Sequence, residues 1–218
     1  MSLARFAYRI GKAPLRRMPA WMLRVRPFTV YAIPTGHFAE LADRPVAPPT
    51  ETVRWATPDD TALLGEVAGH ECAAQWDGVN RRAAIVTDDG QPIACVWVAR
   101  QNYLDPDLDV DVRLYDGDRW LYAAVVAADR RREGVYSRLL RFVGQELHAE
   151  GAKRIVLGVT TGNHASVRAH AKWRPTPLGK ATVLRVLGCV FCRCSGRVGR
   201  VSTSSGNSRN LITLQIER

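Results

Sequence analysis

The stretch AADRRREGVYSRLL, residues 127–140, decides how this sequence is interpreted. It follows the apolar run WLYAAVV at 120–126, which is typical of a buried strand. Beyond Gly134, apolar residues recur at helical spacing until a predicted helix ends at Gly151. The arginines 130–132 therefore lie in a turn between a predicted strand and a predicted helix.

Such a turn can hold an anion. The first N–H groups of a helix lack partners within the helix, and the helix dipole makes this end partly positive. Gly134 would let a phosphate approach the backbone closely, and Arg131 and Arg132 could add charged donors. The alternative is an ordinary strand-to-helix turn with a solvated basic face, and spacing alone does not separate the two.

The same stretch resembles the acyl-coenzyme A binding motif of the GCN5-related N-acetyltransferase (GNAT) superfamily. In that motif a strand leads into Arg or Gln, two residues, Gly, one residue, and Gly or Ala. Arg131 and Gly134 match, and Tyr136 takes the last position. The resemblance implies that this loop binds the pyrophosphate of the coenzyme. The residues it assigns to cofactor binding are Arg131, Arg132, Glu133, Gly134, Val135, Tyr136 and Ser137.

A second segment, NHASVRAHAKW at 163–173, also resembles the family. It matches the family pattern at Asn163, Ser166 and Lys172. His170 takes the place of the usual Tyr, and Arg174-Pro175 replaces Gly-Phe. The resemblance extends over residues 52 to 188 and adds Asn163 and Ser166 to the expected cofactor-binding residues.

The resemblance implies an α/β (α+β) fold, namely a mixed, mostly antiparallel twisted sheet with flanking helices and a splayed parallel pair of strands at its centre. Coenzyme A would lie between the two splayed strands. The backbone of Ala124, Val125 and Val126 would then pair with its pantetheine arm. Acetyl-coenzyme A or another acyl-coenzyme A is the expected co-substrate.

The resemblance further implies an N-acyltransferase that transfers acetyl to an amine by direct attack on the thioester. His170 is a candidate proton donor and could also act as a base through water, whereas the alternative is a histidine that only packs or faces solvent. Tyr122 is the other catalytic candidate, because the predicted strand has no carboxylate and Asp118 is the nearest one upstream. A water relay, or no dedicated base, also remains open.

Two other functions remain open. A non-catalytic module that binds acyl-coenzyme A would account for Tyr136 and the missing strand carboxylate. An O-acyltransferase acting on a sugar or lipid-linked acceptor would use the same co-substrate. The sequence does not identify the acceptor.

The composition is that of a globular protein with a basic surface. Lys and Arg outnumber Asp and Glu by 31 to 21 among 218 residues, and the net charge of +10 favours anionic partners. Nucleic acid is disfavoured because no binding motif accompanies the charge. A homo-oligomer stays open.

The five cysteines form no disulfide framework, and Cys189, Cys192 and Cys194 lack a clear fourth zinc ligand, so no metal is expected. No apolar run approaches the roughly 18 residues of a membrane span, and we expect a cytoplasmic protein.

Two regions differ in charge and pattern. Residues 1–50 are expected to be a basic N-terminal arm with short amphipathic helices and a linker, and residues 51–218 a GNAT-like domain. The arm could dock on the domain, or residues 1–34 could contact an anionic membrane peripherally. Residues 195–210 are expected to form a mobile basic excursion.

Alternation and turn residues predict several elements. Residues 20–26 read as a helix and 27–33 as a strand. Hairpins are expected over 82–100 and again over 111–127, with single strands over 181–191 and 211–217. The expected hairpin edge near Asp107, Asp109 and Asp111 could attract a cationic substrate.

Overall fold

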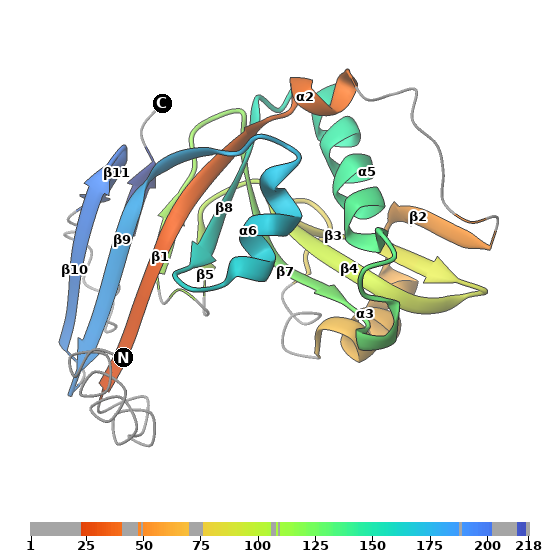
Figure 1. Ribbon diagram of the computed structural model, residues 1–218, viewed down its shortest axis with the longest axis horizontal. Helices are drawn as coiled ribbons and strands as arrows, with labels where there is room; N and C mark the ends of the chain where they lie inside the picture. The colour runs from red at the N-terminus through yellow and green to blue at the C-terminus, as the bar shows by residue number, and fades with distance from the viewer. Residues whose placement is uncertain are drawn as a thin grey trace, which may run out of the picture.

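The computed structural model describes residues 23–40, 48, 50–69, 76–105, 108, 110–187, 189–201 and 213–216. Its main sheet has eight strands in the order β10-β9-β1-β8-β7-β4-β3-β2 (Figure 1). In chain order these are β1 (Leu23–Pro34), β2 (Glu51–Trp55), β3 (Arg81–Asp88), β4 (Gln91–Ala99), β7 (Asp118–Val126), β8 (Arg154–Thr160), β9 (Thr176–Val186) and β10 (Cys189–Gly196).

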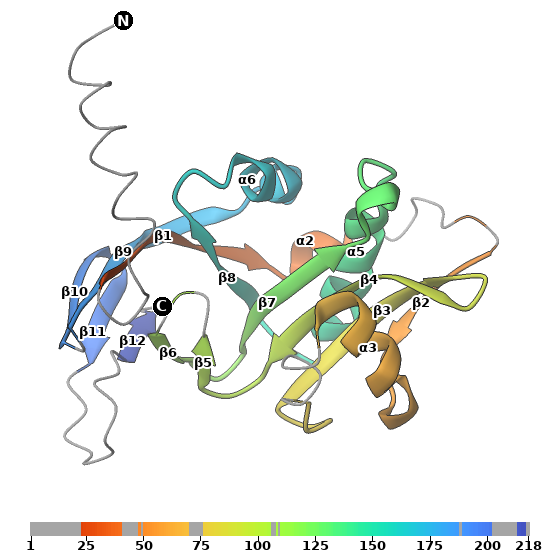
Figure 2. The ribbon, with the colours of Figure 1, turned by 90° about the horizontal axis from the view of Figure 1, so that it is seen from below.

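Helices cover both faces of this sheet. They are α2 (Gly36–Ala39), α3 (Thr61–Ala68), α5 (Val135–Ala149) and α6 (His164–Ala171), with short 3-10 turns η1 (Pro58–Asp60) and η2 (Ala128–Arg130). Residues alternate between two apolar clusters along β3, so that Ala84 and Val86 pack with α5 while Ala83 and Ile85 pack on the face that α3 covers. Figure 2 shows α3 and α5 on opposite faces.

A second sheet lies on the α3 face. It has four strands in the order β11-β12-β6-β5, and its residues join the same apolar cluster as α3. The strands are β5 (Tyr103–Asp105), β6 (Val110–Arg113), β11 (Val198–Val201) and β12 (Thr213–Ile216). One part of the core therefore lies between the main sheet and α5. The other part lies between the main sheet and the side formed by α3 and the second sheet.

The hairpin expected over 111–127 is wrong. β6 pairs with β5 and β12, whereas β7 pairs with β4 and β8. The burial of the two strands explains the difference: β6 alternates between buried and more exposed residues, while the first five residues of β7 are all buried. A strand buried on both faces belongs in the middle of a sheet, so β7 leaves its chain neighbour.

The two central strands run parallel and then separate. β7 and β8 pair from Asp118 opposite Arg154 to Leu121 opposite Leu157, and pair no further although β7 continues to Val126. A bulge against β4 falls in the same part of β7, where Ala123 has a φ of 46°. Figure 2 shows the two strands diverging. The expected mixed sheet with a splayed parallel pair is confirmed.

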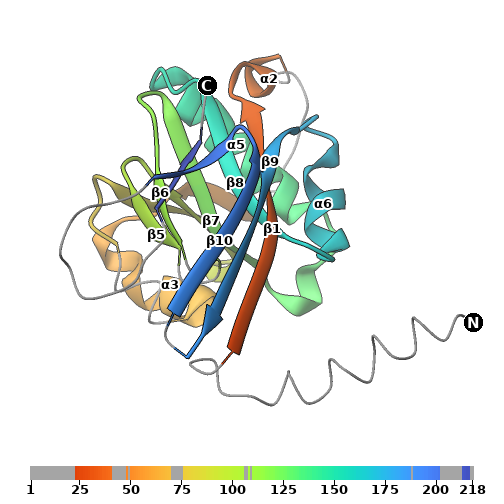
Figure 3. The ribbon, with the colours of Figure 1, turned by 90° about the vertical axis from the view of Figure 1, so that its left-hand side faces the viewer.

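β1 places the N-terminal region inside the sheet. It pairs antiparallel with β8 and with β9, and Figure 3 shows β10, β9 and β1 side by side. The helix expected over 20–26 is wrong from Leu23 onward, because residues 23–26 are extended and pair with β9. The rest of the expected amphipathic segment, residues 1–22, lies outside the described residues.

The C-terminal region differs from the single strand expected over 181–191. The chain turns after Val186, Leu187 has a φ of 47°, and β10 pairs back on β9. Residues 195–201 of the expected excursion belong to β10, β11 and the turn between them, and residues 202–210 lie outside the described residues. So do Asp107 and Asp109, while Asp111 is in β6. The strand expected near the C-terminus is confirmed as β12.

Candidate functional site

The loop between β7 and α5 has the geometry of an anion site. Gly134 is the N-cap of α5 with a φ of 80°, a conformation that favours glycine. A side chain there would lie 3.3 Å from the guanidinium of Arg138, and Arg132 also adopts positive φ. Residues 131–134 are exposed, so the loop presents its backbone to solvent directly before the first turn of α5.

Not all of the arginines in this loop are available to a ligand. Arg130 forms ion pairs with Glu133, Asp88 and Glu51, and its carboxylate partners raise its pKa. Arg131 donates to the carbonyl oxygen of Val126 at 3.2 Å and is exposed. Arg130 thus fixes the loop, whereas Arg131 and Arg132 lie on its surface.

The buried carboxylate of Glu51 anchors the same loop from β2. Its side chain has no exposed surface and accepts two hydrogen bonds from Arg138 of α5, at 2.9 and 2.7 Å. Arg138 also donates to the carbonyl oxygen of Glu133 at 2.9 Å. This contact ties β2, the loop and the first turn of α5 together, and the sequence pattern gave no sign of it.

The expected backbone contacts with the pantetheine arm lie where β7 and β8 have separated. Ala124, Val125 and Val126 form the end of β7, beyond the last residue that pairs with β8. Val125 and Val126 still pair with β4 on their other edge. The edge toward β8 is therefore open to an extended ligand.

Helix α6 begins beside this opening. Asn163 is its N-cap and accepts a hydrogen bond from the N–H of Ser166 at 3.1 Å. The run HASVRAHAKW, residues 164–173, predicts a short helix, and the structure confirms it as α6 over His164–Ala171 with Asn163 as its N-cap. Asn163 is exposed and Ser166 is half-buried, so a ligand could reach polar atoms of both residues.

His170 of α6 is joined to the first turn of α5. The Tyr136 hydroxyl lies 2.6 Å from Nε2 of His170, and Nδ1 of His170 lies 2.8 Å from the carbonyl oxygen of Ser166. A carbonyl oxygen can only accept, so Nδ1 carries a proton. In a neutral imidazole Nε2 then accepts from Tyr136, which fixes the tautomer.

Burial keeps both groups uncharged. The His170 side chain is only 6% exposed, and burial lowers its pKa although the Ser166 carbonyl acts against this shift. Burial also raises the pKa of the Tyr136 phenol. The pair is therefore a neutral phenol donating to a neutral imidazole, and Nε2 of His170 can accept another proton only once the Tyr136 hydrogen bond is broken.

Tyr122 lies in a different environment. It stacks on Tyr103, with ring centroids 4.0 Å apart, and belongs to the apolar cluster on the α3 face. Tyr136, which contacts His170, packs against the cluster on the α5 face. The structure therefore places the two catalytic candidates on opposite faces of the main sheet.

No group of three or more His, Cys, Asp or Glu side chains that could hold a metal occurs within the described ranges. In that part of the chain, no helix is long and apolar enough to cross a membrane.

A family model described as the acetyltransferase (GNAT) family matches residues 47–174. No curated protein matches the sequence.

Several solved structures share the fold at low identity. A functionally unknown conserved protein from Staphylococcus epidermidis is 10% identical with a TM-score of 0.57, over 81% of this chain and 66% of that one. A GCN5-related N-acetyltransferase from Kribbella flavida is 16% identical with a TM-score of 0.51, over 82% and 62%. A putative GNAT-family acetyltransferase from Novosphingobium aromaticivorans is 16% identical with a TM-score of 0.50, over 79% and 66%. The chain thus spans less than two thirds of each of these structures.

Proposed function

Because the chain belongs to the acetyltransferase (GNAT) family, we propose that it transfers an acetyl group from acetyl-coenzyme A to an amine of its acceptor. One observation carries the proposal. The parallel strands β7 and β8 separate beyond Leu121 and Leu157, and the open edge of β7 leads directly into the Gly134 loop and the first turn of α5. An extended arm that ends in a pyrophosphate fits an open strand edge that leads into a helix N-terminus.

Each part of the co-substrate has a proposed partner. The backbone of Ala124, Val125 and Val126 pairs with the pantetheine arm. The pyrophosphate is bound by main-chain N–H groups and side chains of residues 131–137, where the exposed Arg131 and Arg132 supply positive charge. Asn163 and Ser166 at the start of α6 reach the arm from the other side of the opening.

The acceptor amine attacks the thioester carbonyl, the carbon–sulfur bond breaks, and the leaving thiolate requires a proton. We place this proton transfer at Nε2 of His170. The lowered pKa of His170 makes the neutral imidazole the resting form, so it accepts the proton that the amine loses and then delivers it to the thiolate. The Tyr136 hydroxyl must give up its hydrogen bond to Nε2 during this step.

Tyr122 is the second candidate for this role. It follows Leu121, the last residue of β7 that pairs with β8, so it lies where the two strands begin to separate. A phenol at this point could protonate a thiolate held between the strands. Its position in the aromatic cluster of the α3 face distinguishes it from His170.

The proposal is tested by an amine-dependent assay for free thiol with acetyl-coenzyme A and a panel of small amines, peptides and hydroxyl acceptors. If His170 moves the proton, His170→Ala lowers turnover by about 10²-fold while the dissociation constant of coenzyme A stays nearly unchanged. Tyr122→Phe is the matched comparison, because its loss of one hydroxyl would reduce turnover only if Tyr122 is the proton donor.

The other outcomes identify the alternatives. Coenzyme binding in calorimetry without turnover on any acceptor would favour a non-catalytic binding module. Turnover confined to hydroxyl acceptors would favour an O-acyltransferase. Absence of coenzyme binding to the folded protein would contradict all three.

A further inference from the structure

Three neighbouring strands each place an arginine at the same end of the α5 face. Arg82 of β3 is opposite Val98 of β4, and Val98 is opposite Leu121 of β7. Arg100 follows Val98 by two residues and comes directly after β4. Arg119 precedes Leu121 by two residues in β7. Side chains two residues apart share a face, so Arg100 and Arg119 lie on the face that α5 covers.

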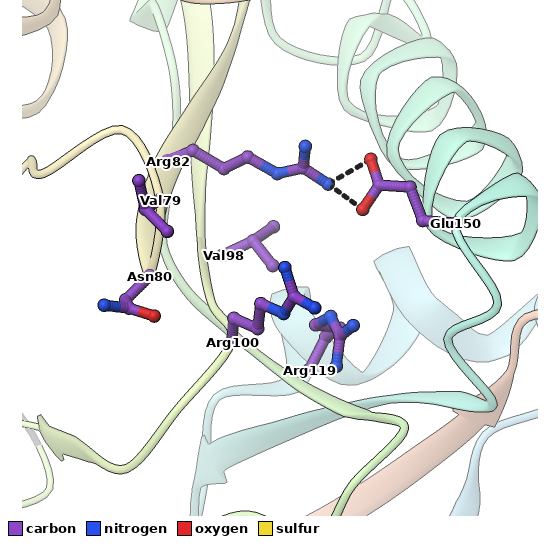
Figure 4. Close-up of a pocket in the computed structure, with 7 residues that line it drawn as sticks. All are labelled: Val79, Asn80, Arg82, Val98, Arg100, Arg119 and Glu150. Carbon is purple, nitrogen blue, oxygen red and sulfur yellow. Dashed lines mark hydrogen bonds and ion pairs between the residues drawn. The ribbon is translucent and has the colours of Figure 1, made fainter.

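These arginines line a hollow of about 430 Å³ beyond the carboxyl end of α5. A smaller cavity that shares these arginines is lined by Val79, Asn80, Arg82, Val98, Arg100, Arg119 and Glu150. Figure 4 shows the guanidinium groups of Arg100 and Arg119 close to each other, with Arg82 reaching toward Glu150. The floor of the hollow is therefore a group of cations fixed by strand register.

Arg82 is held in place by two contacts. Its Nη2 lies 2.5 Å from both carboxylate oxygens of Glu150, and its guanidinium carbon lies 3.8 Å from the ring centroid of Trp55. Glu150 therefore neutralises Arg82 and leaves the charge of the other two arginines. The carbonyl end of α5 offsets only part of that remaining charge.

Arg119 is the unusual member of this group. It is a buried arginine, 7% exposed, and its one described hydrogen bond runs from Nη1 to its own neighbour, the carbonyl oxygen of Asp118, at 2.8 Å. Burial and the nearby charge of Arg100 lower the pKa of Arg119. The charge of Arg82 lowers this pKa further, whereas the charge of Glu150 raises it. Among the described residues, no carboxylate lies within ion-pair distance of Arg119 or Arg100.

We propose that Arg82, Arg100 and Arg119 bind a phosphate group of a small molecule. The three arginines and Glu150 carry a net charge of +2 at neutral pH, which matches a phosphate dianion. Guanidinium groups bind phosphate through paired N–H donors, and Asn80 on the wall can add a further donor. The opening past the exposed Val79 leaves room for an organic group on the phosphate.

This site is separate from the one proposed for coenzyme A. Arg119 lies at the start of β7 and the Gly134 loop follows its end. The seven steps along the strand from Arg119 to Val126 span roughly 23 Å at about 3.3 Å per residue. Phosphate bound at one end of the strand therefore cannot contact the loop at the other end.

The test uses the full-length chain with inorganic phosphate at constant ionic strength, and measures both thermal unfolding and calorimetric binding. Saturating coenzyme A is present in one arm, so that the Gly134 loop is occupied. Acetate replaces phosphate in a second arm. Glycerol 3-phosphate replaces it in a third, to separate a phosphate monoester from the free anion.

We expect saturable stabilisation by phosphate with and without coenzyme A, and weaker stabilisation by acetate. The exposed Arg100→Gln should weaken phosphate binding by about tenfold. Arg113→Gln, which removes one exposed arginine from the other sheet, should leave it unchanged. Arg119→Lys keeps the charge but loses the paired donors and should also weaken binding, with circular dichroism checking its fold. Tighter binding of glycerol 3-phosphate than of inorganic phosphate would support the proposal and show that the site prefers a phosphate monoester.

No phosphate-dependent shift in the wild type would overturn the proposal. So would equal responses of the Arg100 and Arg113 variants, or a phosphate effect that vanishes once coenzyme A is bound.

Discussion

Two glycines at the ends of α5 show how one residue type serves two purposes. Gly134 caps the start of the helix and Gly151 follows its end, and both have a φ of 80°. Around Gly151 there is open space, whereas at Gly134 the exposed backbone forms part of the proposed pyrophosphate site. The same backbone strain would thus arise at both positions on substitution, and only one substitution would obstruct a ligand.

This pair gives a matched test of the loop. Gly134→Val should abolish the rise in melting temperature that coenzyme A causes, because a β-branched side chain would occupy the approach of the phosphate. Gly151→Val should lose about as much intrinsic stability and keep the response to coenzyme A. Thermal unfolding with and without coenzyme A measures both, and an unchanged response of a folded Gly134→Val protein would exclude this loop.

His170 should make folding stability depend on pH. Burial lowers its pKa below the usual value near 6.5, so below that pH the unfolded chain binds more protons than the folded one. The contribution of this group is therefore fully present above about pH 6.5, and it is lost as the pH falls toward the folded pKa.

The measurement is urea unfolding at pH 7.5 and pH 5.5. The wild type should lose more unfolding free energy than His170→Gln across this interval, by at most about 1.4 kcal/mol per pH unit. His164→Gln, which removes an exposed histidine of the same helix, should lose as much as the wild type. Identical losses in all three proteins would show that His170 is not responsible.

At the scale of single residues, the sequence identified candidate residues but not the residues that they contact. Gly134, Asn163 and His170 were singled out because their motifs resemble those of the family, and their roles in binding and catalysis stay predictions. The hydrogen bond between Tyr136 and His170 joins residues 34 positions apart, and the ion pair between Glu51 and Arg138 joins residues 87 apart. Such contacts depend on tertiary packing, which a local pattern does not contain.

At the scale of elements, β2 holds the start of α5 through a single side chain. The fully buried carboxylate of Glu51 faces two arginines, one from α5 and one from η2. A buried charge without its partners is costly, so this contact orients the loop as well as stabilising it.

Replacing this carboxylate should therefore affect both stability and binding. We expect Glu51→Gln to lower the unfolding free energy by about 2 to 3 kcal/mol, because Arg138 loses its one described carboxylate partner and Arg130 loses one of three. We also expect weaker binding of coenzyme A, because the loop is less firmly held. Glu66→Gln in α3, which changes an exposed carboxylate, is the control for urea unfolding and calorimetry. A Glu51→Gln protein of unchanged stability would contradict the proposed role of this contact.

Individual elements were predictable where one local signal dominated. The hairpin of β3 and β4 and the apolar stripe of α5 were both recognised. The second hairpin was not, because a turn at Gly117 does not say whether the flanking strands pair with each other. Burial on both faces decided that β7 pairs elsewhere.

For the molecule as a whole, β1 is the least expected feature. It comes from the region that charge sets apart from the rest of the chain, yet it fills the position between β8 and β9. Phe28, Val30 and Ala32 contribute to the apolar cluster of the α3 face, and Ile33 contributes to the other. The charge pattern describes the segment's polar residues and gives no information about its strand partners.

Truncation should separate the two parts of this region. Removing residues 1–34 deletes β1 and divides the main sheet, because β8 then pairs only with β7 and β9 only with β10, so the protein should not fold. Removing residues 1–22 keeps all of β1 and should preserve a cooperative unfolding transition. Circular dichroism and size-exclusion chromatography provide the comparison, and a folded protein lacking residues 1–34 would show that β1 is dispensable.

The place of β1 also governs how the protein must be made. Pro34 pairs with Arg154, 120 residues later, and Leu23 pairs with Val186. A ribosome adding about 5–20 residues per second needs roughly 8 to 30 s to synthesise the chain between Pro34 and Val186. For most of that time, until β8 (Arg154–Thr160) has been made, the first strand has neither of its neighbours, and its apolar residues must be kept from other nascent chains. We therefore expect slow folding and a dependence on chaperones in the cell, which a shuffled gene that encodes this strand after β9 would relieve.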